Sequence, residues 1–300
     1  MSAGSRRTIQ GFWSGAPLSA INWACLRSFL AAGHHFVIYS YDLLDVPQGV
    51  VVKDACEILP KSSIFHFQNI LTQQSDLGPF ADYFRLKLLA ERGGWYCDVD
   101  TVCLSSELPF GNRVWARESE QDINSVSNGQ LYFEAGDPLA KALLRRCKFK
   151  LLFSKLLFSG LRSRVSLGPR LISSVLAEWD LPRDMCATSQ MFYPIRWIEI
   201  FKLWLPEFTE EIEERVIGAV FLPLYQSFPL HLGLDPYKLP PKGSYLARVL
   251  EKFAPELEGT PYRAAEVREA TRKWFKSQDY RIKDLLGSAR APDALAKLSL

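Results

Sequence analysis

Hydrophobic runs and amphipathic stretches alternate along the first hundred residues, in the order expected of an α/β fold. Residues 8–13 predict a strand, residues 17–32 have a helical repeat that closes at a glycine, and residues 36–39 predict a second buried strand. This order predicts the opening of a nucleotide-binding unit. Ligands of such sheets bind beyond the carboxyl ends of the strands, which is where Trp13 stands.

The clearest helix pattern lies just before residue 93. Pro79 is tolerated in a first helical turn, good helix formers run to Arg92, and two glycines that can adopt positive φ follow. Asp82 and Arg85 are three residues apart, so they share one face of this helix beside its apolar stripe. The pattern therefore predicts a polar pair next to a buried surface.

Two aspartates follow this helix after a short apolar run. Residues 95–97 predict a buried strand, and residues 101–104 resume an extended apolar run. In extended backbone, residues i and i+2 point to the same side, so Asp98 and Asp100 are expected to converge with Val99 turned into the core. Paired carboxylates suit Mg²⁺ or Mn²⁺, which leave coordination positions for phosphate oxygens. An isolated Asp-x-Asp is also common by chance in solvated loops.

The surrounding motif is more specific than the aspartate pair. From Phe80 to Asp100 the chain reads Phe-x-Asp-x-x-Arg, then Gly-Gly-x-Tyr, then Asp-x-Asp. This order resembles the sugar-binding region of the retaining glycosyltransferases that include the yeast initiating mannosyltransferase, the vertebrate α1,4-galactosyltransferases, bacterial polysaccharide transferases and, more distantly, the clostridial glucosylating toxins. The resemblance covers about residues 6–235 and implies a GT-A-like α/β domain, which we place at residues 1–240. The helical pattern of the chain from Lys242 onward predicts a helical C-terminal extension at residues 241–300, on which the resemblance says little. The resemblance also implies Mn²⁺ or Mg²⁺ and a nucleotide-sugar donor, UDP-hexose.

The resemblance gives the acidic and basic residues of the motif their expected roles. Asp98 and Asp100 hold the cation, one of them through water or the donor ribose. Arg85 offsets phosphate charge, and Asp82 accepts hydrogen bonds from donor hydroxyls. Residues 166–170 resemble a Gly-Pro loop of the family and begin a helix whose N-terminal amides could face phosphate or acceptor, although plain helix initiation accounts for the same residues.

The resemblance implies roles for four further positions. Trp13 corresponds to a residue that stacks on the nucleobase, with core packing as the alternative, and Tyr96 is expected to shape the nucleotide pocket. Asn128 matches an Asn that reaches the donor sugar, although Asn before Gly is also an ordinary turn signal. His231 matches a His-Leu-Trp segment that returns to the metal and diphosphate, but this chain has Gly233 where Trp is common.

Composition limits the remaining possibilities. A chain of 300 residues with 48% hydrophobic content can bury a large α/β core and a small appendage, and a net charge of +3 gives no reason to expect a nucleic-acid partner. The six cysteines are scattered without a Cys-x-x-Cys pair, which predicts reduced core residues. The N-terminus shows no long apolar stretch, so neither a secretory signal nor a spanning helix is expected and a cytoplasmic location is predicted.

Residues 141–164 have an unusual charge pattern. They contain eight Lys and Arg residues and no Asp or Glu, interleaved with Leu and Phe. One interpretation is a helix on an anionic lipid surface, which would place the enzyme at the inner face of the membrane beside a lipid-linked acceptor. The other is a core helix with a solvated basic face. C-terminal to the motifs, residues 245–253 and 264–286 predict helices without catalytic groups.

Three alternative functions share part of this pattern. A toxin-like transferase would use the same donor residues on a protein acceptor. A metal-dependent phosphohydrolase would also use paired carboxylates but needs no stacking Trp, and a non-catalytic carbohydrate-binding module would bind sugar without a metal. The sequence favours a metal-dependent glycosyltransferase acting on a glycan or lipid-linked saccharide, as in bacterial surface polysaccharide synthesis. It specifies neither the sugar nor the oligomeric state.

Overall fold

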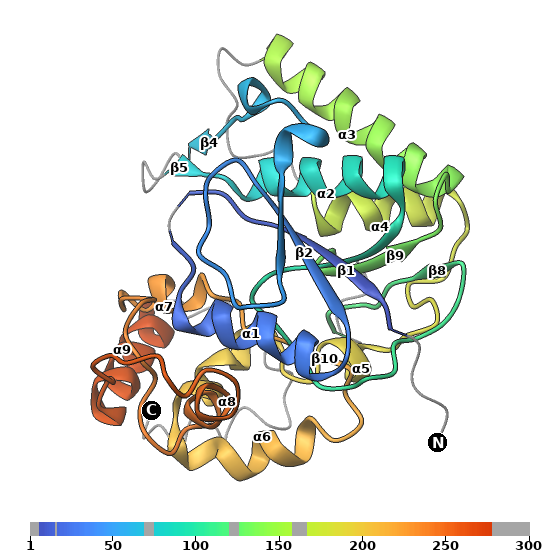
Figure 1. The fold of residues 1–300 in the computed structure, drawn as a ribbon. Helices are drawn as coiled ribbons and strands as arrows, with labels where there is room; N and C mark the ends of the chain where they lie inside the picture. Colours follow the sequence, from blue (N-terminus) through green and yellow to red (C-terminus); the bar gives the residue numbers. More distant parts are fainter. Residues whose placement is uncertain (1–5, 16, 69–74, 120–125, 158–166, 278–300) are drawn as a thin grey trace.

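A six-stranded mixed sheet forms the centre of the molecule (Figure 1). The computed structural model describes residues 6–15, 17–68, 75–119, 126–157 and 167–277. Within them the strand order of this sheet is β3-β2-β1-β6-β9-β8. The strands are β1 (Thr8–Phe12), β2 (His35–Ser40), β3 (Val51–Asp54), β6 (Gly94–Cys97), β8 (Arg113–Val114) and β9 (Gln130–Phe133).

The middle of this sheet contains a change in strand order. β1 pairs in parallel with β2 on one side and with β6 on the other, while β9 runs antiparallel to β6 and β8 antiparallel to β9. The chain moves outward from β1 to β2 and β3, and then returns to the other side of β1 as β6. Such a reversal leaves a crevice beyond the carboxyl ends of β1 and β6, where α/β sheets bind their ligands.

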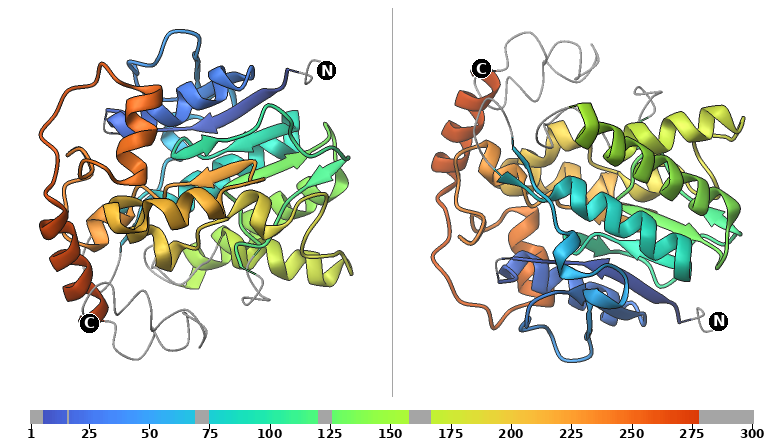
Figure 2. Two further views of the ribbon diagram at one scale, coloured as in Figure 1. Left: turned by 90° about the horizontal axis from the view of Figure 1, so that it is seen from below. Right: turned by 90° about the horizontal axis from the view of Figure 1, so that it is seen from above.

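Helices cover both faces of the sheet (Figure 2). On one face α1 (Ala20–Ala31) packs Leu26 and Phe29 against Phe36 and Ile38 of β2. On the other face α2 (Gly78–Arg92), α3 (Pro138–Leu157) and α4 (Pro169–Glu178) share a second hydrophobic cluster with Phe12 of β1. Burying both faces explains why the predicted strands are continuous apolar runs rather than alternating ones.

The remaining elements lie around this core. Two short strand pairs are β7 (Thr101–Cys103) with β10 (Phe221–Pro223), and β4 (Phe67–Gln68) with β5 (Ser75–Asp76). The short helices are η1 (Ala55–Glu57), η2 (Lys61–Ser63), α5 (Ser189–Phe192), η3 (Trp197–Trp204), η4 (Pro206–Phe208), α6 (Thr209–Arg215) and α7 (Phe228–His231). Helices α8 (Tyr245–Phe253) and α9 (Ala264–Ser277) follow.

The predicted α/β class, a mixed sheet flanked by helices, is confirmed. The helix that closes at residue 92 is also confirmed, and Gly93 ends it with φ of 65°. The helix expected at residues 17–32 begins later, because the Ser19 hydroxyl accepts a hydrogen bond from the Asn22 amide and caps α1 at Ala20.

Several predicted strands are shorter or lie elsewhere. The extended run at residues 101–104 forms β7, which leaves the main sheet and pairs with β10. Residues 113–117 and 126–133 contain only the short strands β8 and β9, and the outer residues of both ranges make only isolated bridges. The helix expected at residues 264–286 is described to Ser277, and the rest of that range lies outside the described residues.

The C-terminal helices share a hydrophobic core with the N-terminal half of the chain. Leu246 and Val249 of α8 and Phe275 of α9 belong to the same buried cluster as Ile21 and Ala24 of α1. The division of the chain at residue 240 stays a prediction. No helix among the described residues is long and apolar enough to span a bilayer. All six cysteines are free; four are buried, whereas Cys56 and Cys186 are exposed.

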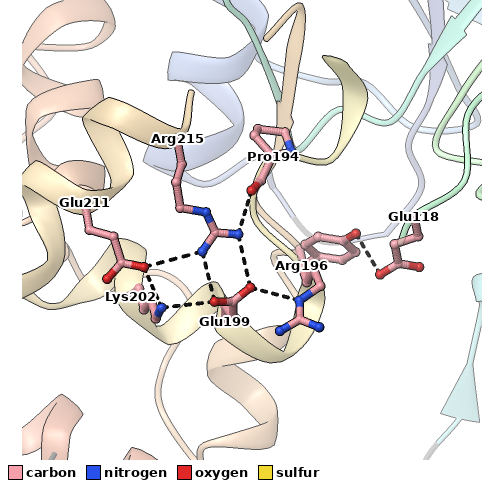
Figure 3. A network of polar contacts seen from close by, with 8 residues as sticks. Glu118, Pro194, Arg196, Glu199, Lys202, Glu211 and Arg215 are labelled. Atoms are coloured by element: carbon pink, nitrogen blue, oxygen red, sulfur yellow. Dashed lines mark hydrogen bonds and ion pairs between the residues drawn. The ribbon is translucent and has the colours of Figure 1, made fainter. Parts of the chain in front are cut away.

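A buried ion cluster joins η3 to α6 (Figure 3). Glu199, whose side chain is 5% exposed, accepts hydrogen bonds from Lys202 at 3.0 Å, from Arg196 at 3.0 Å and from Arg215 at 2.9 and 3.1 Å. Glu211 binds the same Lys202 at 2.6 Å. Burial alone would raise the pKa of Glu199, but its hydrogen bonds to Arg215 and the neighbouring cations lower this pKa to about 2. Glu199 therefore stays charged in the folded protein.

Candidate active site

A cleft of about 240 Å³ opens at the carboxyl ends of β1 and β6. Three segments line it: the end of β1, the first turn of α2 and the chain after β6. The lining residues are Phe12, Trp13, Ser14, Leu77, Gly78, Ala81, Tyr96, Asp98, Val99 and Asp100. The fold thus brings four of the predicted site residues to one cavity, and it does so where the strand order reverses.

The Asp-Val-Asp segment is a turn, which corrects the extended geometry expected from the sequence. β6 ends at Cys97, and the Thr101 amide donates a hydrogen bond to the Asp98 carbonyl at 3.2 Å. Val99 is 4% exposed, as expected of a residue turned into the core, and both aspartates line the cleft. The carboxylates converge because the chain reverses between β6 and β7, not because a strand alternates.

Arg85 is the centre of the acidic cluster. It is 5% exposed, and its guanidinium donates to Asp98 Oδ1 at 2.6 Å and to the Asn128 carbonyl at 2.6 Å. The same group lies 3.6 Å from Asp82 Oδ1 and 4.6 Å from the centre of the Tyr96 ring. One guanidinium thus orients both carboxylates, and Tyr96 supports it from beneath.

Asp82 and Asn128, far apart in the sequence, meet beside Arg85. The Asn128 side-chain amide donates to Asp82 Oδ1 at 2.6 Å. Gly168, directly before α4, packs against this pair so closely that a Cβ there would lie 2.6 Å from Asp82 Oδ2 and 2.9 Å from Asn128 Nδ2. The Gly-Pro loop singled out in the sequence therefore touches the acidic cluster, and glycine is required for the close approach.

Asp100 is held by backbone amides from a segment that sequence reasoning missed. The Gln226 amide donates to Asp100 Oδ2 at 2.9 Å, and the Leu224 amide donates to the Asp100 carbonyl at 2.8 Å. Between them Tyr225 has φ of 45°, a left-handed conformation that is uncommon for a residue with a side chain. This conformation accompanies the convergence of two amides on one aspartate.

A buried polar network extends this contact to the start of α1. Gln226 Nε2 donates to Ser19 Oγ at 2.9 Å, Ser19 and Asn22 form the capping box of the helix, and Asn22 Nδ2 donates to the Val99 carbonyl at 3.3 Å. The acidic turn is thereby anchored through the cap of α1. The spacing of Ser19 and Asn22 is a sequence signal for a helix start, but nothing in it indicates a partner beyond residue 220.

The carboxylates of the cleft have raised pKa values. Burial is the first cause for Asp98, whose pKa is raised to about 7; Arg85 opposes the rise, and the negative charges of Asp100 and Asp82 add to it. Burial also raises the pKa of Asp100 and of Asp82. Three carboxylates share one guanidinium, which leaves a surplus of two negative charges when all are ionised. Such a site attracts a cation.

The oxygen atoms of Asp98 and Asp100 provide some of the ligands that a divalent cation requires. Asp98 binds Arg85 through Oδ1 and Asp100 binds Gln226 through Oδ2, so the second oxygen of each carboxylate takes no part in these two contacts. In the described part of the chain, no three His, Cys, Asp or Glu side chains are grouped as metal ligands. His231 is exposed, its ring lies 5.7 Å from that of Trp197, and it is not among the residues that line the cleft.

The two aromatic residues predicted at the nucleotide pocket have different environments. Trp13 is half-buried at the end of β1, where its amide donates to the Tyr39 carbonyl at 3.0 Å. It packs against the buried cluster that contains Phe36 and is also among the residues that line the cleft. Tyr96 is 1% exposed and lies under Arg85. Of these two residues, only Trp13 is exposed enough to contact a ligand, whereas Tyr96 packs against the guanidinium of Arg85.

Part of the chain that contains this site is similar to a known protein family. A family model described as "Glycosyltransferase sugar-binding region containing DXD motif" matches residues 47–120, which include α2, β6 and the acidic turn. This part of the chain is therefore similar to the sugar-binding region of DXD-motif glycosyltransferases. The match confirms the predicted enzyme class and the DXD motif; it does not confirm the narrower resemblance to the yeast mannosyltransferase family. No curated protein matches the sequence.

The solved structures that resemble this protein have low sequence identity to it and low TM-scores. The PaToxG glycosyltransferase is 12% identical with a TM-score of 0.42, over 90% of this chain and 85% of the other. The glycosyltransferase GlyE of Streptococcus pneumoniae TIGR4 is 13% identical with a TM-score of 0.43, over 92% of this chain. This chain spans 64% of the length of GlyE. Similarities at this level carry no information on donor or acceptor.

Proposed function

We propose that this protein is a metal-dependent glycosyltransferase that moves a hexose from a UDP-linked sugar to a saccharide acceptor with retention of anomeric configuration. The observation that carries the proposal is the shared cleft: Asp98, Asp100 and Trp13 line one cavity at the point where the strand order reverses. A nucleotide diphosphate can use both a metal-binding acidic group and an aromatic surface in one cavity, whereas a plain phosphate ester needs only the first.

Asp98 and Asp100 would hold Mn²⁺ or Mg²⁺, which neutralises the diphosphate leaving group when bound. The chain's own contribution is to fix these two carboxylates. Arg85 orients Asp98 through a hydrogen bond of 2.6 Å, and the Gln226 amide orients Asp100. Because both supports are built before any ligand arrives, little reorganisation accompanies binding.

The other side of Arg85 would receive the donor sugar. Asp82 accepts a hydrogen bond from Asn128 with Oδ1, and its second oxygen lies beside Gly168. We infer that Asp82 accepts hydrogen bonds from donor hydroxyls and that Asn128 holds it in place. Trp13 would stack on the uracil ring from the end of β1.

The proposed acceptor is a glycan or lipid-linked saccharide, as in bacterial surface polysaccharide synthesis at the inner face of the membrane. The basic helix α3 supports this choice over a protein acceptor. Incubation with labelled nucleotide sugar, membranes and soluble protein distinguishes the two: label in the lipid fraction is expected, and label in polypeptide would instead indicate a toxin-like protein modification.

Thermal unfolding with a panel of nucleotide sugars tests the donor site. One UDP-hexose at about a hundred times its Kd, together with Mn²⁺, is expected to raise the Tm by roughly 5–10 °C, because it binds only the folded state. EDTA is expected to remove this shift. Equal stabilisation with and without chelator would contradict metal-dependent binding, and no stabilisation by any nucleotide sugar would contradict the proposed function.

Gly168→Ala is expected to impair transfer much more than folding. The new methyl group would meet Asp82 Oδ2 at 2.6 Å and displace the carboxylate from the donor sugar. A displacement of this kind lowers kcat/KM by about a hundredfold. Gly259→Ala is a matched control, since a Cβ there meets only the flexible Leu239 side chain, at 3.1 Å or more. Steady-state kinetics of both variants provide the measurement; equal kcat/KM values would contradict the assignment of Asp82.

A further inference from the structure

Helix α3 exposes a cluster of large apolar side chains on its outer face. Phe149, Leu152 and Phe153 are 63%, 59% and 52% exposed. They are spaced by three and four residues, so they share one face, and the Phe149 and Phe153 rings stack at 6.1 Å with an interplanar angle of 17°. These three residues are called the Phe149 patch below. Contiguous exposed apolar side chains are typical of surfaces that contact a protein or a membrane.

The patch is not part of the hydrophobic core. The opposite face of α3 buries Leu139, Leu143, Cys147 and Leu151 at the natural helical spacing, and these residues pack with α2 and α4. The helix is therefore already anchored without the patch. In Figures 1 and 2, α3 lies at the outside of the molecule, on the far side of α2 from the sheet. The Phe149 patch is free to meet a partner without disturbing the fold.

The chemistry around the patch is basic. Helix α3 contains no Asp or Glu, and Lys141, Arg145 and Lys148 are exposed on the face that surrounds the patch. Arg146 pairs with Glu178 of α4, at 2.6 and 2.8 Å. Cationic side chains bordering aromatic and leucine side chains match the boundary between the headgroups and acyl chains of an anionic bilayer.

The same helix approaches the proposed sugar site with its inner face. The Cys147 thiol has its pKa raised by burial and, secondarily, by the negative charge of Asp82. Cys147 also belongs to the same buried cluster as Phe84 of α2, the helix that contains Asp82. A surface held by Phe149 and Phe153 would keep this edge of the enzyme at the membrane, close to where a lipid-linked acceptor is presented.

We propose that α3 is a peripheral membrane-docking helix that inserts the Phe149 patch into the surface of an anionic bilayer. A second copy of this chain is a poorer occupant, because a two-fold contact through α3 would bring together two helices that contain lysines and arginines but no Asp or Glu. The inference deepens the proposed function, since it names the surface that would meet a lipid-linked acceptor. Binding to lipid can nevertheless be measured without any transfer reaction.

Vesicle sedimentation of the full chain tests the proposal. Vesicles of phosphatidylcholine with about one third phosphatidylglycerol are expected to bind the protein at least about tenfold more tightly than phosphatidylcholine alone, and added salt is expected to weaken the binding. The double variant F149S/F153S is expected to bind at least about tenfold more weakly than the unaltered protein. Its Tm is expected to be unchanged, because both rings are mostly exposed.

A matched variant distinguishes binding through the Phe149 patch from non-specific binding by other exposed apolar side chains. Phe110→Ser removes a ring that is 82% exposed elsewhere on the surface and is expected to leave vesicle binding unchanged. Equal binding to neutral and anionic vesicles, or unchanged binding of F149S/F153S, would overturn the proposal. So would a dimer in sedimentation velocity that F149S/F153S dissociates. Vesicle binding without transfer of any sugar would contradict the proposed function and leave the docking surface intact.

Discussion

Asp100→Asn is expected to lower the rate of sugar transfer by at least about a thousandfold while leaving the fold intact. Asn has nearly the same shape, and its side-chain oxygen can still accept the hydrogen bond that the Gln226 amide gives to Asp100 at 2.9 Å. The change removes one of two charges that would hold the cation. Initial rates with a labelled nucleotide sugar measure the loss, and thermal unfolding without ligand measures the fold.

A remote substitution of the same type controls for this result. Asp180 follows α4 with φ of 50°, a conformation that Asn tolerates well, and it is exposed. Asp180→Asn is expected to leave the transfer rate within a factor of about two, as for a surface change with no partner at the site. Near-normal turnover of Asp100→Asn, with the stabilisation by nucleotide sugar and Mn²⁺ retained, would remove Asp100 from the metal site.

Glu199→Gln is expected to destabilise the folded protein by about 3–5 kcal/mol. The amide would leave Arg196, Lys202 and Arg215 without the carboxylate that joins them in Figure 3, in a site where Glu199 is 5% exposed. Breaking one partner of a buried charge group is more harmful than losing a surface pair. Urea unfolding monitored by tryptophan fluorescence gives the free energy of unfolding.

The same cluster predicts a dependence of stability on pH. The pKa of Glu199 is depressed in the folded state, from an ordinary value of 4.5 to about 2. The resulting stabilisation, about 3 kcal/mol, is fully present above pH 4.5 and is lost as the pH falls toward 2. Glu199→Gln is expected to lack this part of the acid sensitivity.

An exposed carboxylate provides the control for the stability measurements. Glu213 pairs with Arg248 at the surface, with side chains 46% and 52% exposed. Glu213→Gln is expected to change the free energy of unfolding by less than about 1 kcal/mol. If Glu199→Gln and Glu213→Gln have similar stabilities, the buried cluster does not contribute as its geometry indicates.

The elements that were predicted well are those whose signals are local. Gly93 ends α2 because a positive φ is required there, and the apolar run at residues 95–97 forms β6 within one residue. The pairing of Asp82 with Arg85 follows from helical spacing alone. The turn at Asp98 was not predictable in this way, because an Asp-Val-Asp segment reads equally well as extended chain, and the reversal is set by pairing of β7 with β10.

The contacts that support the acidic turn depend on the tertiary structure. Gln226 reaches Asp100 from more than a hundred positions away, and its side chain continues to Ser19. Sequence reasoning placed the returning ligand at His231, five residues later, where the structure shows an exposed ring beside Trp197. The role of His231 as a metal ligand rests on the family resemblance alone. No local sequence pattern indicates that Gln226 rather than His231 contacts the acidic turn.

Crystals grown with Mn²⁺ and a non-transferable UDP-sugar test the central claim most directly. Anomalous scattering from manganese is expected to show one peak within bonding distance of Asp98 and Asp100, with the diphosphate beside it and the uracil on Trp13. A peak or a diphosphate bound elsewhere, with the cleft between β1 and β6 lacking both, would contradict the assignment of this cleft as the donor site.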